Sequence, residues 1–209
     1  MNNRNGAKGQ SLVEFALVLP VLLLLIIGMA EVGFAFYDYI VVASANREGV
    51  RLGSRGQFSE ISVVERIVAT GGVETNEDVT EPVLRTSGEN PNFGIIITSI
   101  AISPTGALAI GSPVITGVIA FNGGVRPITA EDTRIDFASL SMQQDVTAGV
   151  NSLRAGSDFE PLRNDIVIVE TFFAHDALFS PLTQVIRLGD PIPLYFRSAM
   201  RVLRSNRLD

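Results

Sequence analysis

The carboxylate of Glu14 stands at the start of a long apolar run, where an ionised group is costly. The stretch GQSLVEFALVLPVLLLLIIG covers residues 9–28, and Glu14 is its only charged residue. A charge at the centre of a membrane-spanning helix costs about 2.5–3.5 kcal/mol on insertion scales, and less near the edge, where Glu14 lies. Such a carboxylate is expected to offset this cost by pairing with a cation. Glu31 lies beyond the other end of the run. It either pairs with a cation in the same way or simply marks the membrane boundary.

A second charged group, Arg47, Glu48 and Arg51, follows the apolar run in the segment SANREGVRLGS. Arg47 and Glu48 are adjacent and cannot face each other on a helix, whereas Arg47 and Arg51 are four residues apart and share a face. This spacing predicts a basic stripe that meets an acidic partner or lipid headgroups. A solvated helix face is the simpler interpretation, and the sequence leaves both open.

His175 is the only histidine, and Asp176 follows it directly in FFAHDALF. A Ser-His-Asp triad would need a serine, yet no G-x-S-x-G motif accompanies the pair, and the flanking aromatic residues indicate a strand end or loop. One histidine without cysteine also argues against a catalytic zinc site, and no phosphate-binding or calcium-binding spacing occurs. We therefore expect no enzyme, no metal and no cofactor; a membrane-anchored hydrolase is the weakest alternative.

Length and charge limit the class of protein further. The chain has 209 residues, 46% of them hydrophobic, which suits one anchor and one modest folded domain. Its formal net charge of −6 disfavours binding to a phosphate backbone, so no nucleic-acid partner is expected. The absence of cysteine excludes disulfides and thiol chemistry.

The apolar run is long enough to cross a bilayer. Phe15 to Phe36 contains one charge, Glu31, and as a helix would extend roughly 33 Å. The core of the run is apolar on every face, which disfavours a buried soluble helix, and Pro20 is tolerated in a membrane helix. A secretory signal peptide is the competing interpretation, but no small-x-small cleavage site follows.

Helical character continues beyond the membrane segment to about Leu52, with Gly53 as a plausible stop. Ser59 resembles the N-cap of a second helix that ends at Gly71-Gly72, and residues 74–92 read as an acidic loop. Strands are predicted at 93–103, 113–121, 165–173 and 192–202, and a helix at 129–155 with Thr129 as its cap and an apolar face of Leu140, Val146, Val150 and Leu153. The predicted fold class is α+β, with a long N-terminal helix on an antiparallel sheet of about four strands.

The residues around Gly9 resemble the processing site of type IV prepilins, in which a glycine precedes the cut and a glutamate follows five residues later. More broadly, the N-terminal quarter is similar to the TadE-like family, which comprises minor pilins or pseudopilins of the tight-adherence (Flp, type IVb) pilus system. The closing segments 166–173 and 192–202 also resemble the family, whereas 56–160 matches only in general pattern. The residues that carry the resemblance are Gly9, Glu14, Ala16, Leu17, Val18, Leu19, Pro20 and Glu31, followed by Ala45, Arg47, Glu48, Gly49 and Arg51.

This resemblance implies that prepilin peptidase cuts after Gly9 and makes Gln10 the mature N-terminus. A glycine suits the open conformation that a peptidase cleft requires. Glu14 would then pair with its own new amine or with that of a neighbouring pilin, and only the second pairing would set a register for assembly. The implied assembly residues are Glu14, Glu31, Arg47, Glu48 and Arg51.

The resemblance divides the chain into a leader at 1–9, a membrane and projecting helix at 10–54, and an extracytoplasmic domain at 55–209. It implies a single-pass protein of the bacterial inner membrane, or of an extracellular pilus, that takes part in pilus assembly and adhesion. The implied partners are prepilin peptidase, other pilins and pseudopilins, the inner-membrane assembly platform and the lipid bilayer. The alternative is a signal-anchored extracytoplasmic binding domain outside any pilus.

Overall fold

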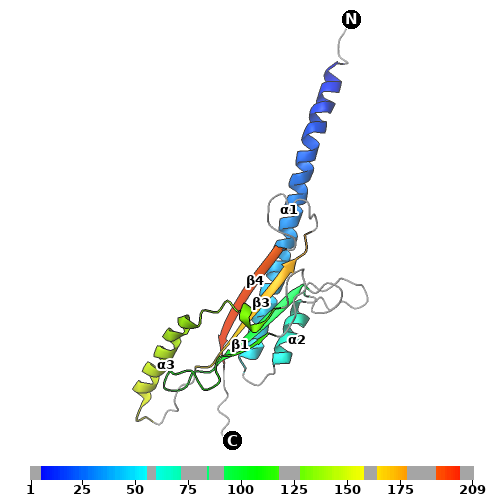
Figure 1. The fold of residues 1–209 in the computed structure, drawn as a ribbon. Coiled ribbons are helices and arrows are strands. Elements are labelled where there is room, and N and C mark those ends of the chain that lie inside the picture. Colours follow the sequence, from blue (N-terminus) through cyan, green and yellow to red (C-terminus); the bar gives the residue numbers. More distant parts are fainter. Residues whose placement is uncertain are drawn as a thin grey trace. The chain divides into compact units, whose positions relative to one another are not determined.

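The computed structural model describes residues 6–55, 60–71, 84, 92–117, 128–157, 164–177 and 192–202. Within them the chain has the α+β fold predicted from the sequence, with one long N-terminal helix and one four-stranded sheet (Figure 1). The elements are α1 (Gly6–Gly53), α2 (Glu60–Gly71), β1 (Phe93–Ile100), β2 (Val114–Gly117), the 3-10 turns η1 (Ala130–Asp132) and η2 (Phe137–Leu140), α3 (Ser141–Arg154), β3 (Ile166–His175) and β4 (Ile192–Arg201).

The chain divides into two compact units, one of residues 1–38 with 175–192 and one of residues 39–174 with 193–209. The first unit holds the apolar part of α1, including Pro20. The most apolar stretch of this helix has a mean hydropathy of 2.7, and none of it is buried by the protein. Among the described residues, α1 is the one helix long and apolar enough to cross a membrane, which suggests a single-pass anchor.

The second unit contains the sheet, whose strand order is β2-β1-β3-β4. β1 is antiparallel to both of its neighbours, and Phe93 to Ile100 pair with Phe173 to Ile166 along its whole length. The four predicted strands are thus confirmed with shifted ends. β1 stops at Ile100, β3 continues to His175, and the predicted strand at 113–121 is described only as far as residue 117.

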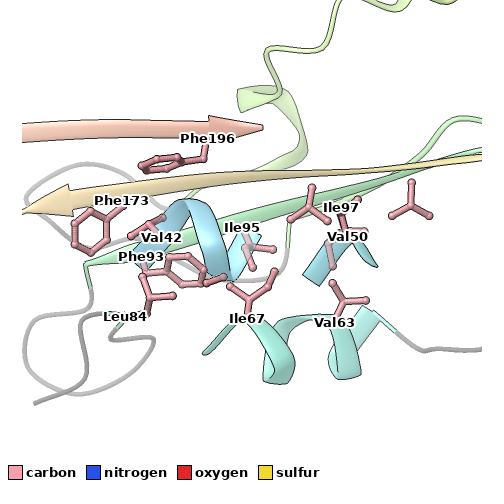
Figure 2. Packing of buried hydrophobic residues seen from close by; sticks show 13 residues of the cluster. Val42, Val50, Val63, Ile67, Leu84, Phe93, Ile95, Ile97, Phe173 and Phe196 are labelled. Atoms are coloured by element: carbon pink, nitrogen blue, oxygen red, sulfur yellow. The ribbon is translucent and has the colours of Figure 1, made fainter. Parts of the chain in front are cut away.

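Alternation along β1 and β3 places one set of side chains toward α1 and α2. Figure 2 shows this cluster, in which valines of α1 and α2 lie beside isoleucines and phenylalanines of the strands. The two helices approach closely at Gly49, where a Cβ atom would lie 2.3 Å from Cγ1 of Ile67. The buried members are Val42, Ala45, Val50, Val63, Ile67, Leu84, Phe93, Ile95, Ile97, Val167, Val169, Phe173 and Phe196.

The predicted helix at 129–155 is wrong in its first half, because α3 begins only at Ser141. Thr129 does cap a helical turn, but it is the 3-10 turn η1, where Asp132 accepts hydrogen bonds from the Thr129 amide and hydroxyl. The amide of Arg134 donates to Glu170 on β3 at 2.8 Å. An amide bonded to a sheet side chain cannot also close a helical turn, so the helix is interrupted here.

The predicted apolar face is wrong at Val146 and Leu153, which are exposed, whereas Leu140 is buried and Val150 is half-buried. Thr147 of α3 is buried, and its hydroxyl donates to the carbonyl oxygen of Gln143. α3 instead contacts the turn before Gly106 by a polar bond, from Asn151 to the carbonyl of Pro104.

Several predictions fall largely outside the described residues. They are the start of the leader, the cap at Ser59 and the acidic loop at 74–92, of which Leu84 and Asn92 are described. Leu84 is buried in the cluster of Figure 2.

Candidate functional site

The predicted processing position lies in the first turns of α1. Gln10 donates from its side-chain nitrogen to Oε1 of Glu14 across 3.1 Å, and both side chains are exposed. The structure therefore brings together the two residues that the resemblance links. Gly9 is helical here, so a peptidase that reads an extended substrate would have to open this turn before cutting.

Glu31 is buried, unlike Glu14, and its partner is His175. The Nε2 atom of His175 lies 3.3 Å from Oε1 of Glu31, and Nδ1 lies 2.6 Å from Oδ2 of Asp38. All three residues belong to the first compact unit. His175 ends a strand, as predicted, but the carboxylates that face its ring come from α1 and not from the adjacent Asp176.

This arrangement leaves neither ring nitrogen of His175 facing a serine hydroxyl, as a Ser-His-Asp triad would require. Within the described part of the chain, no group of three or more His, Cys, Asp or Glu side chains is arranged to hold a metal ion. Sequence reasoning missed the cluster of Glu31, Asp38 and His175. The available signal was weak: Glu31 and Asp38 are seven residues apart, which places them on one face of a helix.

The charged segment after the apolar run forms an ion-pair network with α2. Arg51 binds Glu48 through two nitrogens at 2.9 and 3.0 Å, and Arg66 of α2 reaches the same carboxylate at 3.0 Å. These hydrogen bonds, that of Arg51 first, hold the pKa of Glu48 below its usual value. Of the two arginines in the predicted basic stripe, Arg51 is thus paired with Glu48 and Arg47 is exposed.

The network borders a hollow of about 530 Å³ between α1 and α2, lined mainly by charged side chains. Arg55 adds a third arginine to Arg51 and Arg66, and Glu65 adds a second carboxylate to Glu48. Both signs are present, so the hollow can accept a charged group of a partner but does not define one.

A buried carboxylate on β3, Glu170, was not predicted as a site residue. It accepts hydrogen bonds from the Thr133 hydroxyl, from the Arg134 amide at 2.8 Å and from the Tyr195 hydroxyl at 2.6 Å. Burial, and then the bond to Glu170, raise the pKa of Tyr195. The guanidinium of Arg134 lies 4.6 Å from the centre of the Tyr195 ring. Glu170 therefore ties the segment after η1 to β3 and β4.

Together, the fold and these residues define an α+β protein with a candidate membrane helix that carries an exposed carboxylate near its start. Residues 9–51 match the family model described as TadE-like protein. This match confirms the resemblance over the segment that contains Gly9, Glu14, Glu31 and the Arg47–Arg51 charges, and a TadE-like segment indicates a protein associated with the Tad pilus. No curated protein and no solved structure gives a significant match to the chain.

Proposed function

We propose that the protein is a minor pilin or pseudopilin of a tight-adherence, Flp-type pilus. Prepilin peptidase removes the leader after Gly9, and the mature subunit takes part in pilus assembly and surface adhesion. The observation that carries this proposal is the position of Glu14, which is exposed on an apolar helix and bonded to Gln10, the residue that would become the N-terminus.

Cleavage would provide Glu14 with a cationic partner, because the cut creates a free amine on Gln10 close to the carboxylate. A free amine on Gln10 lies about one helical turn from Glu14. Pairing with its own amine would offset the cost of a carboxylate beside lipid, and pairing with the amine of a neighbouring subunit would also set the register between two helices. The exposed apolar surface of α1 offers the rest of such a helix–helix contact.

The proposed location is the bacterial inner membrane, with α1 as a single-pass anchor and the rest of the chain outside the cytoplasm or in an extracellular pilus. Its proposed partners are prepilin peptidase, other pilins and pseudopilins, the assembly platform and the lipid bilayer. Arg47 and the network of Glu48 and Arg51 are proposed as a further assembly contact. No catalytic role is proposed.

Co-expression with a prepilin peptidase tests the proposal, with the intact mass and the N-terminal residue of the purified protein as readouts. The expected product begins at Gln10, and Gly9→Ala is expected to slow its formation strongly. Gly6→Ala is the matched control, because it makes the same change in the same helical turns away from the cut. An unchanged mass, with Gly9 still joined to Gln10, would remove the main support for a pilin.

One observation favours the alternative of an anchored binding domain. A hollow of about 290 Å³ opens between α1, α2 and the sheet, and its lining is mostly apolar, with Asp165 and two serines at its border. This is near the lower limit for a small-molecule site. Two results together would support this second function. The chain would be recovered uncut from cells that make it, and cells that lack it would still assemble pili normally.

A further inference from the structure

The imidazole of His175 lies between two carboxylates of α1. Its Nδ1 atom is 2.6 Å from Asp38 and its Nε2 atom is 3.3 Å from Glu31. The side chains of His175 and Glu31 are 4% and 7% exposed, and that of Asp38 is 19% exposed. Three ionisable groups are thus gathered in one largely buried place, although 137 residues separate His175 from Asp38 along the chain.

Helix geometry explains how one ring reaches both carboxylates. Glu31 and Asp38 are seven residues apart, which is almost two full turns, so their side chains leave the same face about 10.5 Å apart along the axis. The two nitrogens of an imidazole point in different directions, and in the protonated ring both donate. His175 is therefore suited to bridge the two carboxylates, and serine or asparagine would be too short.

Such a cluster is costly to break. When one partner of a buried hydrogen-bonded cluster is removed, the polar groups that remain lose their partner in a poorly solvated place. Glu31 also lies within the segment predicted to span the membrane, where ionisable side chains are normally paired. Contact with His175 supplies that pairing inside the chain.

Glu14 and Glu31 are consequently not equivalent. Glu14 is exposed and accepts a hydrogen bond from Gln10 of the same helix, whereas Glu31 is buried against a residue from the end of β3. We propose that Glu31, Asp38 and His175 form an intramolecular latch that fastens the chain at the end of β3 to α1. Glu31 is then a latch residue, and Glu14 is the carboxylate presented to a partner subunit. The statement about Glu14 rests on the proposed function; the latch does not.

A single spin label can test the latch in the full chain in detergent micelles. The chain has no cysteine, so Ala177→Cys, two residues beyond His175, carries a unique label. The variants are Glu31→Gln, Asp38→Asn, His175→Ala and the pair Glu31→Gln with His175→Ala. Glu14→Gln is the matched control, with the same carboxylate-to-amide change on the exposed side chain. Circular dichroism checks the fold, and Asp38→Asn, at the most exposed of the three positions, keeps the test open where a harsher variant fails to fold.

Each latch variant is expected to raise the ratio of mobile to immobile label roughly tenfold or more. The double variant is expected to match the larger single effect, because the first change already opens the latch. Glu14→Gln is expected to leave the ratio unchanged. An unchanged ratio in both Glu31→Gln and Asp38→Asn, or effects that multiply in the double variant, would overturn the latch.

Incorporation of the same variants into pili separates the latch from the proposed function. Glu31→Gln and Asp38→Asn are expected to reduce incorporation to the same extent, because both act through the latch. A much larger loss for Glu31→Gln than for Asp38→Asn would make Glu31 an intermolecular contact and contradict the proposal. Normal incorporation of Glu14→Gln, with the label still responding to Glu31→Gln, would reject the assembly role of Glu14 and leave the latch standing.

Discussion

Asn46 of α1 donates a hydrogen bond to the hydroxyl of Thr171 on β3 across 2.6 Å, although 125 residues separate them in the chain. The same side-chain nitrogen lies 3.1 Å from the carbonyl oxygen of Val169, and Asn46 is fully buried. Apolar packing alone would allow the helix to slide or rotate over the strand. A directional polar bond inside the apolar cluster selects one position, because any other would leave a buried polar group without its partner.

Removal of the Thr171 hydroxyl is therefore expected to destabilise the fold. Thr171→Val keeps the shape of the side chain and deprives Asn46 of one acceptor, which is expected to cost about 1–3 kcal/mol. Thr171→Ser is the control, since it retains the hydroxyl. Denaturant unfolding of the full chain in micelles, followed by circular dichroism, measures both. A Thr171→Val variant as stable as the unchanged protein would show that the hydrogen bond contributes nothing to stability at this position.

Gly49 is predicted to be intolerant of any side chain. In Gly49→Ala the new methyl group would meet two atoms of Ile67 at 2.3 and 2.4 Å, so α1 and α2 would have to separate or Ile67 would have to leave its rotamer. Overpacking of this kind costs about 1–3 kcal/mol. Thermal unfolding of the full chain provides the measurement.

Gly33→Ala is the matched control for that substitution. It makes the same change in the same helix, at a position where a Cβ atom would have nothing within 4 Å. We expect it to be neutral or slightly stabilising, because alanine favours helix more than glycine does. Ile67→Val, which shortens the obstructing side chain, is expected to restore part of the stability of Gly49→Ala. Failure of this rescue would place the strain elsewhere.

Glu48 is expected to contribute a small stability that disappears in acid. Its folded pKa is lowered, first by the hydrogen bond from Arg51 and then by that from Arg66. The unfolded chain therefore takes up a proton first as the pH falls below about 4.3, and the contribution is lost as the pH passes through the lower folded value. Because the pair is at the surface, Glu48→Gln is expected to cost less than about 1 kcal/mol at neutral pH.

The measurement is the free energy of unfolding between about pH 7 and pH 3. As the pH falls through this range, the curve for Glu48→Gln should approach that of the unchanged protein. Glu65→Gln, on the exposed face of α2, is the matched control for the change from carboxylate to amide. A constant gap between the Glu48→Gln curve and that of the unchanged protein at every pH would exclude titration of Glu48 as the cause.

The sequence predicted those elements whose signal is local. The apolar run, the four strands and the second helix follow from periodicity, and each was found with ends shifted by a few residues. The first half of the helix predicted at 129–155 failed because its amide at Arg134 bonds Glu170, which lies 36 residues away. A local sequence pattern cannot show that a side chain on a distant strand will bind a backbone amide of the predicted helix.

The same distinction applies to the candidate site. Glu14 could be predicted because its relation to Gly9 and to the apolar run is short-range. The partner of Glu31 could not, because His175 reaches it only when β3 has formed and ended beside α1, and the adjacent Asp176 was the more obvious neighbour in the sequence. Buried polar contacts such as that of Asn46 also depend on the fold, since a lone Asn in a helix normally indicates an exposed face.

Tyr195 is expected to make the fold sensitive to alkali. Burial first, and then the hydrogen bond to Glu170, raise its folded pKa. The unfolded chain ionises this phenol near pH 10, before the folded chain does, so stability is complete below about pH 10 and falls as the pH rises through the folded value. Tyr195→Phe removes the titrating group, so its stability should decline less steeply above about pH 10 than that of the unchanged protein.

Glu170→Gln separates the two causes of that shift. The amide has the same shape as the carboxylate but no charge, so the pKa of Tyr195 should fall while remaining above its ordinary value, because burial persists. Tyrosinate absorbance follows the titration directly, since the chain has three tyrosines and no tryptophan, and subtraction of the Tyr195→Phe curve isolates the one of interest. If Glu170→Gln left the Tyr195 titration where it is in the unchanged protein, burial alone would hold the phenol protonated. The bond to Glu170 would then serve only to join β3 to β4.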